Sequence, residues 1–596
     1  MTETRYAIGI DLGTTNCTLS KLDLHDSESV DATVCAVQQI VHPHEIDARN
    51  QLPSFLYAPV EEEKGAGAFR LPWSAEPDHI VGTYAQKRGS EVPGRVASSA
   101  KSWLSHNGVD RRDSILPYDA ADDVEKMSPV EASAHYLRTL RLSWDHSHPE
   151  HPLESQDVVV TVPASFDAVA RTLTEEAIRM AGLDGSVTLL EEPQAALYAW
   201  VAKCGERWRD HLAVGDTILV CDIGGGTTDL SLIEVGETNG NLSLERLAVG
   251  DHILLGGDNM DLTLAHVLKA QLEADGKRVE DWQLRAMTHG CRAAKEALFD
   301  DQTLESFPVA VPGRGKKLIG GTLKTELHRN QAEEVLLGGF FPEVSVDTAP
   351  TRARRVGLTA LGLPYAQDAG VTRHLAAFLS KQETAAQTHS FRHPSALLFN
   401  GGVTRSAVVR DRIVRIVNQW IQQDGGQEIR VLPDADPDMA VSQGAAYFGR
   451  VRQGKGIRIR GGTTKSYYVG IERAELAVPG IPPKVDAICI APYGMEEGTE
   501  NVLPLDLGLV VGESASFRFM ASGENKDEKV GNVANPTDLE ELPPIETILK
   551  LNEQESGQLV PVRLQSRVTE VGTLELSALE THGDRRWKLE FNVRTQ

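Results

Sequence analysis

The chain has 596 residues, of which 41% are hydrophobic and 24% are charged, and its formal net charge is −25. This length is too great for a single hydrophobic core and predicts two or more domains. The acidic balance argues against unaided binding to nucleic acid or to anionic membranes. The N-terminus lacks a signal-peptide pattern, and no apolar run approaches the roughly 20 residues that span a bilayer. We therefore expect a cytoplasmic protein.

The cysteines are dispersed along the chain and form no C-x-x-C pair; they are Cys17, Cys35, Cys204, Cys221, Cys291 and Cys489. This distribution is typical of free thiols in a reducing compartment rather than of a disulfide framework or a zinc site. Several of them have apolar neighbours, which predicts that they pack in the interior.

The first motif is YAIGIDLGTTNCTLS at Tyr6–Ser20. Its two apolar stretches predict strands, and between them stand Asp11, Gly13, Thr14 and Thr15. A turn of this kind can expose backbone N–H groups, and its hydroxyls can donate hydrogen bonds to an anion. The motif therefore predicts a phosphate-binding turn between two strands.

The following hundred or so residues are mixed in character and rich in loops. Lys101 lies there in VASSAKSWL, and its local sequence predicts a lysine on the solvated surface. Pro129–Trp144 places apolar side chains at helical spacing and predicts an amphipathic helix.

Strands and helices alternate in the next part of the chain. Asp157–Val162 is an apolar run that predicts a buried strand, and Phe166–Ala181 predicts a helix with Asp167 near its start. Leu189–Trp200 predicts a strand, a turn and a further helix. This order indicates an α/β domain.

A second motif, ILVCDIGGGTTDLSLIEV at Ile218–Val235, repeats the first. Asp222 matches Asp11, and the turn Gly224–Thr227 matches the turn of the first copy. Two such hairpins facing each other would clamp a polyphosphate, and each would supply a carboxylate toward a metal. Mg²⁺ is typical of such a place, because it keeps several waters and uses few protein carboxylates.

Further glycine turns follow. LGGDNMD at Leu255–Asp261 predicts a helix start with a candidate phosphate nest, and Ser395–Arg405 predicts a strand and a Gly-Gly turn before another helix. Trp282–Phe299 and Pro437–Phe448 predict helices, with Asp438 near the start of the second, where the helix dipole favours an acid.

The character of the sequence changes after about residue 450. GKGIRIRGGTTKS is basic and glycine-rich, which predicts a linker at 451–465 between a first domain at 1–450 and a second at 466–596. Short alternating strands with turn residues between them predict a β-sandwich there. Its acidic, proline-containing segment Gly523–Glu546 predicts a mobile loop.

Taken together and in this order, the motifs resemble the seventy-kilodalton heat-shock chaperones (the Hsp70 family), within the actin–hexokinase ATPase superfamily. The matching pieces are IGIDLGTTNC, VVVTVPASFDAVAR, LLEEPQAALYA, LVCDIGGGTTDLSLI, LLGGDNMD, FNGGVTR and PDMAVSQGAA. They cover the chain to about Gly449. YYVGIE and GTLELSALE are similar to the family's substrate-binding β-sandwich. The resemblance implies an α/β, actin-like ATPase domain with duplicated mixed sheets, followed by a small β-sandwich domain.

The resemblance also implies roles by position. The catalytic residues would be Lys101, Glu192, Asp222 and Thr227. The residues that bind ATP or ADP would be Asp11, Gly13, Thr14, Thr15, Gly224, Gly225, Gly226, Thr227, Gly256, Gly257, Lys295, Gly401, Gly402, Arg405 and Asp438. Asp11 and Asp222 would hold Mg²⁺ through its water. Pro163 and Arg171 fall where the family couples its nucleotide state to the partner domain.

The chain departs from the family pattern in several places. The adenosine-contact helix carries Arg292, Lys295, Glu296 and Phe299 where the family has an acid, lysine, arginine and serine, so the arginine that stacks on adenine is missing. The family's linker is acidic and leucine-rich, whereas the present one is basic. The segment Gly357–Leu379 has no counterpart. No helical pattern follows the β-sandwich, so the family's helical lid is not expected.

These implications predict an ATP-hydrolysing chaperone that couples its nucleotide state to the binding of unfolded or extended peptide segments. Co-chaperones and nucleotide-exchange factors are the further partners expected, and neither nucleic acid nor membrane is. Two alternatives stay open. One is a nucleotide-binding scaffold or regulatory protein with little turnover. The other is a small-molecule kinase of the same superfamily, which would need an acceptor pocket with a base.

Overall fold

The computed structural model describes most of the chain: residues 4–26, 31–185, 187–238, 241–311, 323–351, 363–382, 389–433, 436–454, 463, 465–473, 484–495, 499–511, 514–522, 528–548, 558–568, 574–583 and 585–590. The chain divides into two compact units. The first comprises Met1–Val235 and Val249–Ile457, and the second comprises Gly236–Ala248 and Arg458–Gln596. Most of the predicted linker at 451–465 and the first part of Gly357–Leu379 lie outside the described residues.

The strands before residue 457 are β1 (Tyr6–Leu12), β2 (Asn16–Asp23), β3 (Thr33–Val34), β4 (Val37–His42), β5 (Glu45–Arg49), β6 (Leu52–Pro53), β7 (Phe55–Tyr57), β8 (Ile80–Val81), β9 (Val96–Ser98), β10 (Asp157–Val162), β11 (Val187–Glu191), β12 (Thr217–Ile223), β13 (Thr228–Thr238), β14 (Asn241–Val249), β15 (Ser306–Val311), β16 (Leu323–His328), β17 (Ala396–Asn400) and β18 (Arg430–Val431). The helices are α1 (Thr83–Glu91), α2 (Ala100–Leu104), α3 (Pro129–Ser147), α4 (Ala168–Met180), α5 (Glu192–Cys204), α6 (Gly257–Ala274), α7 (Asp281–Asp300), α8 (Arg329–Phe340), α9 (Val371–Ser380), α10 (Ala407–Gln423) and α11 (Ala440–Arg452). No described helix is long and apolar enough to cross a membrane.

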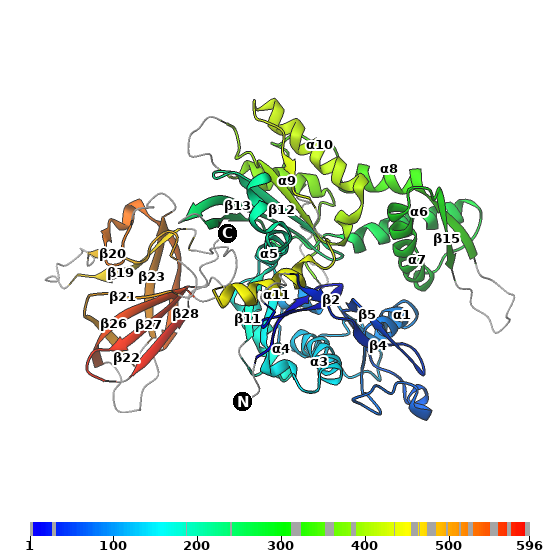
Figure 1. Ribbon diagram of the computed structural model, residues 1–596, viewed down its shortest axis with the longest axis horizontal. Coiled ribbons are helices and arrows are strands. Elements are labelled where there is room, and N and C mark those ends of the chain that lie inside the picture. Colours follow the sequence, from blue (N-terminus) through cyan, green and yellow to red (C-terminus); the bar gives the residue numbers. More distant parts are fainter. Residues whose placement is uncertain are drawn as a thin grey trace. The chain divides into compact units, whose positions relative to one another are not determined.

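Two mixed sheets with the same topology organise the first unit (Figure 1). In one, β1 pairs antiparallel with β2 and parallel with β10, which pairs parallel with β11. In the other, β12 pairs antiparallel with β13 and parallel with β17, which pairs parallel with β18. The registers also correspond, because Asp11 stands opposite Thr161 and Asp222 stands opposite Asn400. The predicted actin-like fold with duplicated mixed sheets is therefore confirmed.

The predicted helices are confirmed, and their ends follow from local chemistry. Ser128 accepts a hydrogen bond from the backbone N–H of Glu131, whose carboxylate accepts one from the N–H of Ser128, so a capping box starts α3. Asp167 caps α4 by accepting from the N–H of Ala170 at 2.7 Å. Pro193 occupies the first turn of α5, where its missing N–H costs nothing.

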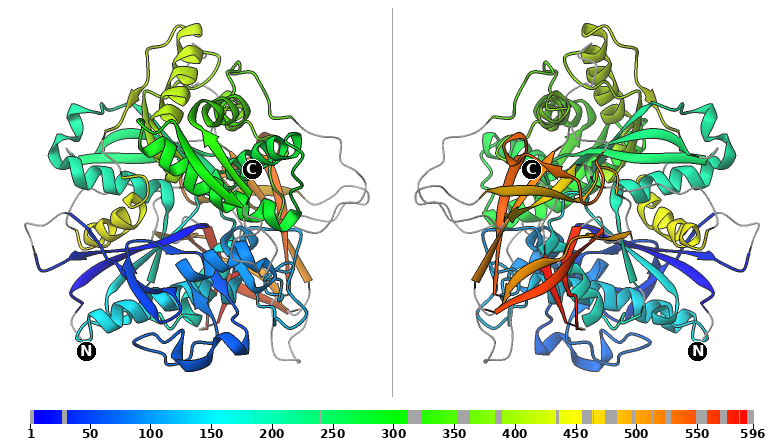
Figure 2. Two further views of the ribbon diagram at one scale, coloured as in Figure 1. Left: turned by 90° about the vertical axis from the view of Figure 1, so that its right-hand side faces the viewer. Right: turned by 90° about the vertical axis from the view of Figure 1, so that its left-hand side faces the viewer.

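Helix α11 lies between the two halves of the first unit (yellow in Figure 2). Its small residues permit a very close approach to its neighbours. A Cβ added at Gly444 would lie 1.7 Å from the backbone oxygen of Ala195 in α5. A Cβ added at Gly9 in β1 would lie 2.0 Å from the backbone oxygen of Ser442 in α11. Glycines in α11 and in β1 thus allow α11 to pack directly against both α5 and β1.

Replacing Gly444 with alanine is expected to lower the free energy of unfolding by about 1–3 kcal/mol, because backbone atoms must move to admit the methyl group. The matched control is Gly338→Ala in α8, where an added Cβ meets nothing within 4 Å. That substitution should raise stability by roughly 0.5–1 kcal/mol, since alanine costs less chain entropy in a helix. Denaturant unfolding measures both, and equal effects would contradict the close contact.

The second unit contains the predicted β-sandwich. Its strands from Arg458 onward are β19 (Ser466–Glu472), β20 (Val485–Ala491), β21 (Glu500–Val502), β22 (Leu507–Val511), β23 (Ser514–Ser522), β24 (Val533–Ala534), β25 (Glu540–Ile548), β26 (Gln558–Val568), β27 (Leu574–Glu580) and β28 (Arg586–Glu590). One sheet has the order β24-β20-β19-β23-β25, and in the other β21 and β22 pair with β26, followed by β27 and β28. The short strands β21 and β24 were not predicted.

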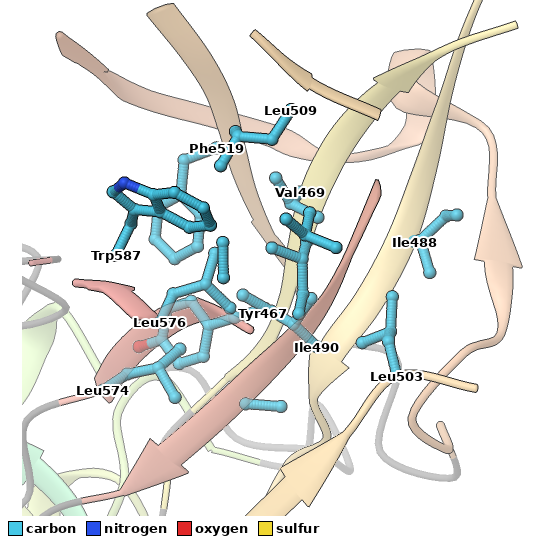
Figure 3. Packing of buried hydrophobic residues seen from close by; sticks show 14 of the residues in the cluster. Tyr467, Val469, Ile488, Ile490, Leu503, Leu509, Phe519, Leu574, Leu576 and Trp587 are labelled. Carbon is cyan, nitrogen blue, oxygen red and sulfur yellow. The ribbon is translucent and has the colours of Figure 1, made fainter. Parts of the chain in front are cut away.

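Both sheets contribute side chains to one core (Figure 3). Tyr467 and Phe519 from the first sheet stack with ring centroids 5.7 Å apart, and Leu576 and Trp587 come from the second sheet. These side chains are all less than 10% exposed. The alternation read from the sequence therefore corresponds to the inward face of a sandwich.

The mobile loop predicted for Gly523–Glu546 is wrong at residues 540–546, which belong to a strand, and the short strand β24 also lies within the segment. Residues 540–548 form β25, which pairs with β23. The paired prolines at 543 and 544 favour a loop in the sequence, because proline cannot donate a hydrogen bond to a neighbouring strand. They are tolerated because β25 ends its sheet and the register shifts at this point, so that Phe519 pairs with Leu542 and Phe517 with Ile545.

Candidate functional site

The two repeated turns lie in contact. Thr14 and Thr15 follow β1, and the three glycines of the second turn follow β12. A Cβ added at Gly225 would lie 2.1 Å from Oγ1 of Thr15, and one added at Gly226 would lie 2.7 Å from Cγ2 of Thr14. Only glycine permits this approach, so the structure brings the two predicted phosphate turns together.

Each turn carries its acid in an equivalent place. Thr161 in β10 donates through Oγ1 to Oδ1 of Asp11 at 3.2 Å. Asn400 at the end of β17 donates through Nδ2 to Oδ2 of Asp222 at 2.6 Å. Gly401 follows with a φ of 81°, and a Cβ there would lie 2.6 Å from Oδ1 of Asp222. The neighbouring parallel strand thus positions each carboxylate.

Lys101 and Glu192 form a buried ion pair in the same region. Nζ of Lys101, from the short helix α2, lies 2.5 Å from Oε1 of Glu192, the first residue of α5. Their residues are 7% and 8% exposed. The surface position that the local sequence predicted for Lys101 is therefore wrong. Its burial arises from a partner that is 91 positions away in the chain.

The charges at the site are out of balance in favour of acids. Burial raises the pKa of Asp11 and of Glu192, although Lys101 opposes both shifts. Burial also raises the pKa of Asp222 to about 7, against the hydrogen bond from Asn400. For Lys101, burial alone would lower the pKa, but Glu192 and Asp11 outweigh it and raise the pKa. The carboxyls around Lys101 outnumber it, so an added cation would be stabilised here.

The residues present fit a magnesium nucleotide. Oγ1 of Thr15 and Oδ1 of Asn400 are buried without a hydrogen-bond partner among the described residues. An unsatisfied hydroxyl beside glycine amides suits a phosphate oxygen. Carboxylate oxygens are the donors that Mg²⁺ prefers, and it usually binds through only one or two of them.

The start of α6 is joined to the second turn. The backbone N–H of Gly257 donates to the oxygen of Gly224 at 3.0 Å, and that of Asp258 donates to the oxygen of Gly225 at 2.7 Å. A Cβ at Gly256 would lie 2.5 Å from the oxygen of Gly224. These two N–H groups therefore bond to backbone oxygens of the second turn. The predicted nest at the start of α6 lies beside the phosphate turns.

The predicted base and sugar residues form two ion-pair groups. Lys295 in α7 pairs with Asp261 in α6 at 2.6 Å and donates to the oxygen of Gly257 at 3.2 Å. The unusual Arg292 pairs with Asp258 and with Asp261. The charges on this face of α7 are thus engaged by acids of α6.

The second group surrounds Arg405. Its guanidinium lies 2.9 Å from Asp438 and 2.9 Å from Asp300, the last residue of α7. A Cβ at Gly402 would lie 3.2 Å from Oδ1 of Asp438. Asp438 stands in the turn before α11 and not in the helix itself, which corrects the predicted helix start.

Sequence reasoning missed a cluster next to the site. Oγ of Ser165 donates to Oδ1 of Asp229 at 2.6 Å, and Nδ1 of His252 lies 3.1 Å from the same oxygen. Although burial opposes it, His252 lowers the pKa of Asp229, so this acid stays ionised. Asp229 also acts on the pKa of Asp222 and Lys101. Asp229 follows the two threonines of the second motif. This acid was the signal in the sequence that could have pointed to the cluster.

Replacing Asp222 with asparagine is expected to stabilise the nucleotide-free and Mg²⁺-free protein at pH 8. In the unfolded chain such a carboxyl loses its proton near pH 4, whereas in the folded chain its pKa is about 7. Between these values the folded state binds the extra proton, so stability falls as the pH rises from ~4 to ~7. The gain should be on the order of 2 kcal/mol, because one pKa unit corresponds to about 1.4 kcal/mol and part of the carboxyl stays in water.

Denaturant unfolding of the wild type and Asp222→Asn at pH 5 and pH 8 checks this. The gain should be small at pH 5, where wild-type Asp222 is protonated in the fold. An equal gain at both values would contradict the raised pKa.

The duplicated sheets and their facing turns define the class of actin-like domains. Comparison with known proteins agrees. The family model for "Hsp70 protein" matches residues 74–338. The chaperone protein HscA homolog of Burkholderia cenocepacia is 29% identical over 456 residues, which are 74% of this chain and 58% of that protein. Two further relatives are 30% identical over about half of this chain and 43% of their own length: the HscA homolog of Pseudoalteromonas atlantica and the chaperone protein HscA of Salmonella paratyphi C.

The chain is thus similar to the Hsp70 family over residues 74–338 and to the HscA chaperones over a longer stretch. The matched region spans 58% of the length of the first relative and 43% of the other two.

Proposed function

We propose that this protein is a Mg²⁺-dependent ATPase that acts as a chaperone and couples its nucleotide state to the binding of unfolded peptide segments. The observation that carries the proposal is the contact between the two turns, with the Lys101–Glu192 pair beside them. The similarity to the Hsp70 family model and to HscA chaperones supports the same activity. Relatives named as chaperones support the second half of the proposal.

Each side chain would have a distinct part in hydrolysis. The amides of Gly224–Gly226 and the hydroxyls of Thr14, Thr15 and Thr227 would hold the β- and γ-phosphates. Lys101 would place its charge at the γ-phosphate, and Glu192 and Asp222 would orient the attacking water. Bound Mg²⁺, ordered through water by Asp11 and Asp222, would neutralise developing negative charge. Phosphoryl transfer depends on such positioning and neutralisation more than on covalent chemistry.

The nucleoside end would be lined by the remaining predicted residues: Gly256, Gly257, Lys295, Gly401, Gly402, Arg405 and Asp438. Lys295 and Arg405 already have acidic partners. We therefore expect them to shape the pocket and to contact ribose or phosphate, rather than to stack on the base. ADP would remain in the same place after hydrolysis.

The β-sandwich would bind the peptide by strand addition, in which main-chain hydrogen bonds give affinity and side-chain pockets give selectivity. β24 stands at one end of its sheet, and Val533 in it is 60% exposed. Leu559 on β26 is 68% exposed. Exposed apolar side chains on the sandwich suit an extended apolar segment. Co-chaperones and exchange factors would act on the same cycle.

The test is ATP turnover and peptide affinity measured together, with a reduced and carboxymethylated protein as the permanently unfolded probe. The proposal expects turnover to rise with the probe, and probe affinity to differ between ATP and ADP. Val533→Ser/Leu559→Ser should weaken probe binding and leave basal turnover unchanged. Turnover that no unfolded probe alters, with probe affinity independent of nucleotide, would overturn the coupling.

A scaffold with little turnover is the second candidate. It is favoured by one observation, the pairing of Arg292 with Asp258 and Asp261 where the family has a base-contacting pattern. ATP bound stoichiometrically and released unhydrolysed would support it against the first proposal.

A further inference from the structure

Two histidines and an aspartate gather at the amino end of β17, away from the phosphate turns. His389 and His393 lie in the segment before the strand, and Asp424 is the C-cap residue of α10. Each of the three can offer one ligand atom, and these atoms all lie within 4.8 Å of one another. The three residues, here called the His–His–Asp cluster, are half-buried and therefore accessible to an ion.

The spacing of the cluster is close to that of a zinc site. Nε2 of His393 lies 2.8 Å and Nδ1 of His389 lies 3.7 Å from Oδ2 of Asp424. Ligands of a tetrahedral zinc ion with bonds of ~2.0–2.1 Å are about 3.3 Å apart. The two observed distances lie on either side of this value. Small side-chain rotations would thus admit the ion.

The imidazole rings are already arranged together. Their centroids are 4.1 Å apart with an interplanar angle of 36°. Nδ1 of His389 also lies 3.1 Å from the backbone oxygen of Asp424. A bound zinc would replace this contact, because one ring nitrogen cannot both donate a hydrogen bond and ligate a metal. The backbone N–H of Ser390 donates to Oδ2 of Asp424 at 2.8 Å. The carboxylate is therefore fixed from the backbone, as the outer contacts of metal ligands usually are.

The turn after α10 is shaped around one of these ligands. Gly425 has a φ of 76°, which ends the helix. A Cβ added at Gly426 would lie 2.3 Å from Nδ1 of His393 and 2.6 Å from Cγ2 of Ile421. Glycine at 426 thus leaves the space that the imidazole of His393 occupies. This close fit is independent of the spacing of the ligand atoms.

We propose that the His–His–Asp cluster binds one zinc ion, with water in the remaining position. Two imidazoles and one carboxylate are a donor set that zinc accepts. The ion would join the segment before β17 to the end of α10. β17 ends at Asn400, which donates to Asp222, and a five-residue strand is about 15 Å long. The ion would therefore support β17 from the end opposite the phosphate turns.

Zinc affinity of the metal-stripped full chain, measured by competition with a chromogenic chelator, tests the proposal. One Zn²⁺ per chain is expected. His389→Ala and His393→Ala should each weaken it by at least ~100-fold, since even indirect partners of a metal are worth about 10–100-fold. Gly426→Ala removes no ligand and should also weaken it. Co²⁺ should give the absorption bands of a four-coordinate site in the wild type and not in either histidine variant.

The matched control is His42→Ala/His328→Ala, which removes two exposed imidazoles from β4 and β16. It should bind zinc as the wild type does. Near-ultraviolet circular dichroism without metal reports whether each variant is folded. Zinc binding that survives in folded His389→Ala/His393→Ala, or that is lost in Cys35→Ser/Cys204→Ser instead, would overturn the proposal.

Discussion

Lys101→Ala is expected to lower the turnover number for ATP by about 100- to 1,000-fold, the usual effect of removing one preorganised group that stabilises the transition state. The ammonium group is buried against Glu192 and is the cation that the acids of the site share. The KM for ATP should change much less, because the interaction is made mainly in the transition state. Phosphate release under saturating ATP measures the effect.

The control is Lys64→Ala, which removes a lysine that is paired with Glu61 near the surface. It should retain wild-type turnover. Because Lys101→Ala leaves Glu192 buried without its partner, near-ultraviolet circular dichroism must show that the variant is folded. Full turnover in folded Lys101→Ala would show that the catalytic assignment is wrong.

Arg171→Met is expected to lower the free energy of unfolding by about 3–5 kcal/mol, because it removes a buried charge that pairs with a buried carboxylate. Nη2 of Arg171 lies 3.1 Å from Oε1 of Glu191, and the two side chains are 2% and 3% exposed. Nε of Arg171 also donates to the backbone oxygen of Phe166 at 3.3 Å, and Nη2 donates to that of Pro163 at 3.5 Å. The pair thus joins α4 to the strand that precedes Glu192.

Denaturant unfolding checks this prediction against a control, Arg112→Met. This variant removes a 57% exposed guanidinium that pairs with Glu176 of α4. That change should cost less than about 1 kcal/mol, as surface pairs do. Arg171→Met/Glu191→Leu should recover much of the loss by removing both charges. Equal costs for Arg171→Met and Arg112→Met would contradict the role of burial.

The repeated pattern of strand, acid, glycine and threonine was enough to predict the two facing turns. The repetition is local, and the duplicated topology places both copies at the carboxyl ends of their central strands. Capped helices were predicted for the same reason, since Ser128 and Asp167 act within one turn of their own helices.

Features made by distant partners could not be predicted in this way. The burial of Lys101 depends on Glu192, and the hydrogen bond from Asn400 to Asp222 joins residues 178 positions apart. The loop prediction covers residues 540–546 because proline usually breaks strands, whereas the end position of β25 in its sheet removes that cost. The catalytic roles expected for Lys101 and Glu192 came from the resemblance to a family and not from local pattern.

The most direct test of the proposed function is phosphate release from ATP by the purified chain with and without Mg²⁺. The proposal predicts turnover that requires Mg²⁺ and that is lost in folded Asp11→Asn/Asp222→Asn. It also predicts stimulation of the wild type by an unfolded protein. ATP that is bound and never hydrolysed, or hydrolysis that persists in the double variant, would contradict the assignment of the two turns as the hydrolytic site.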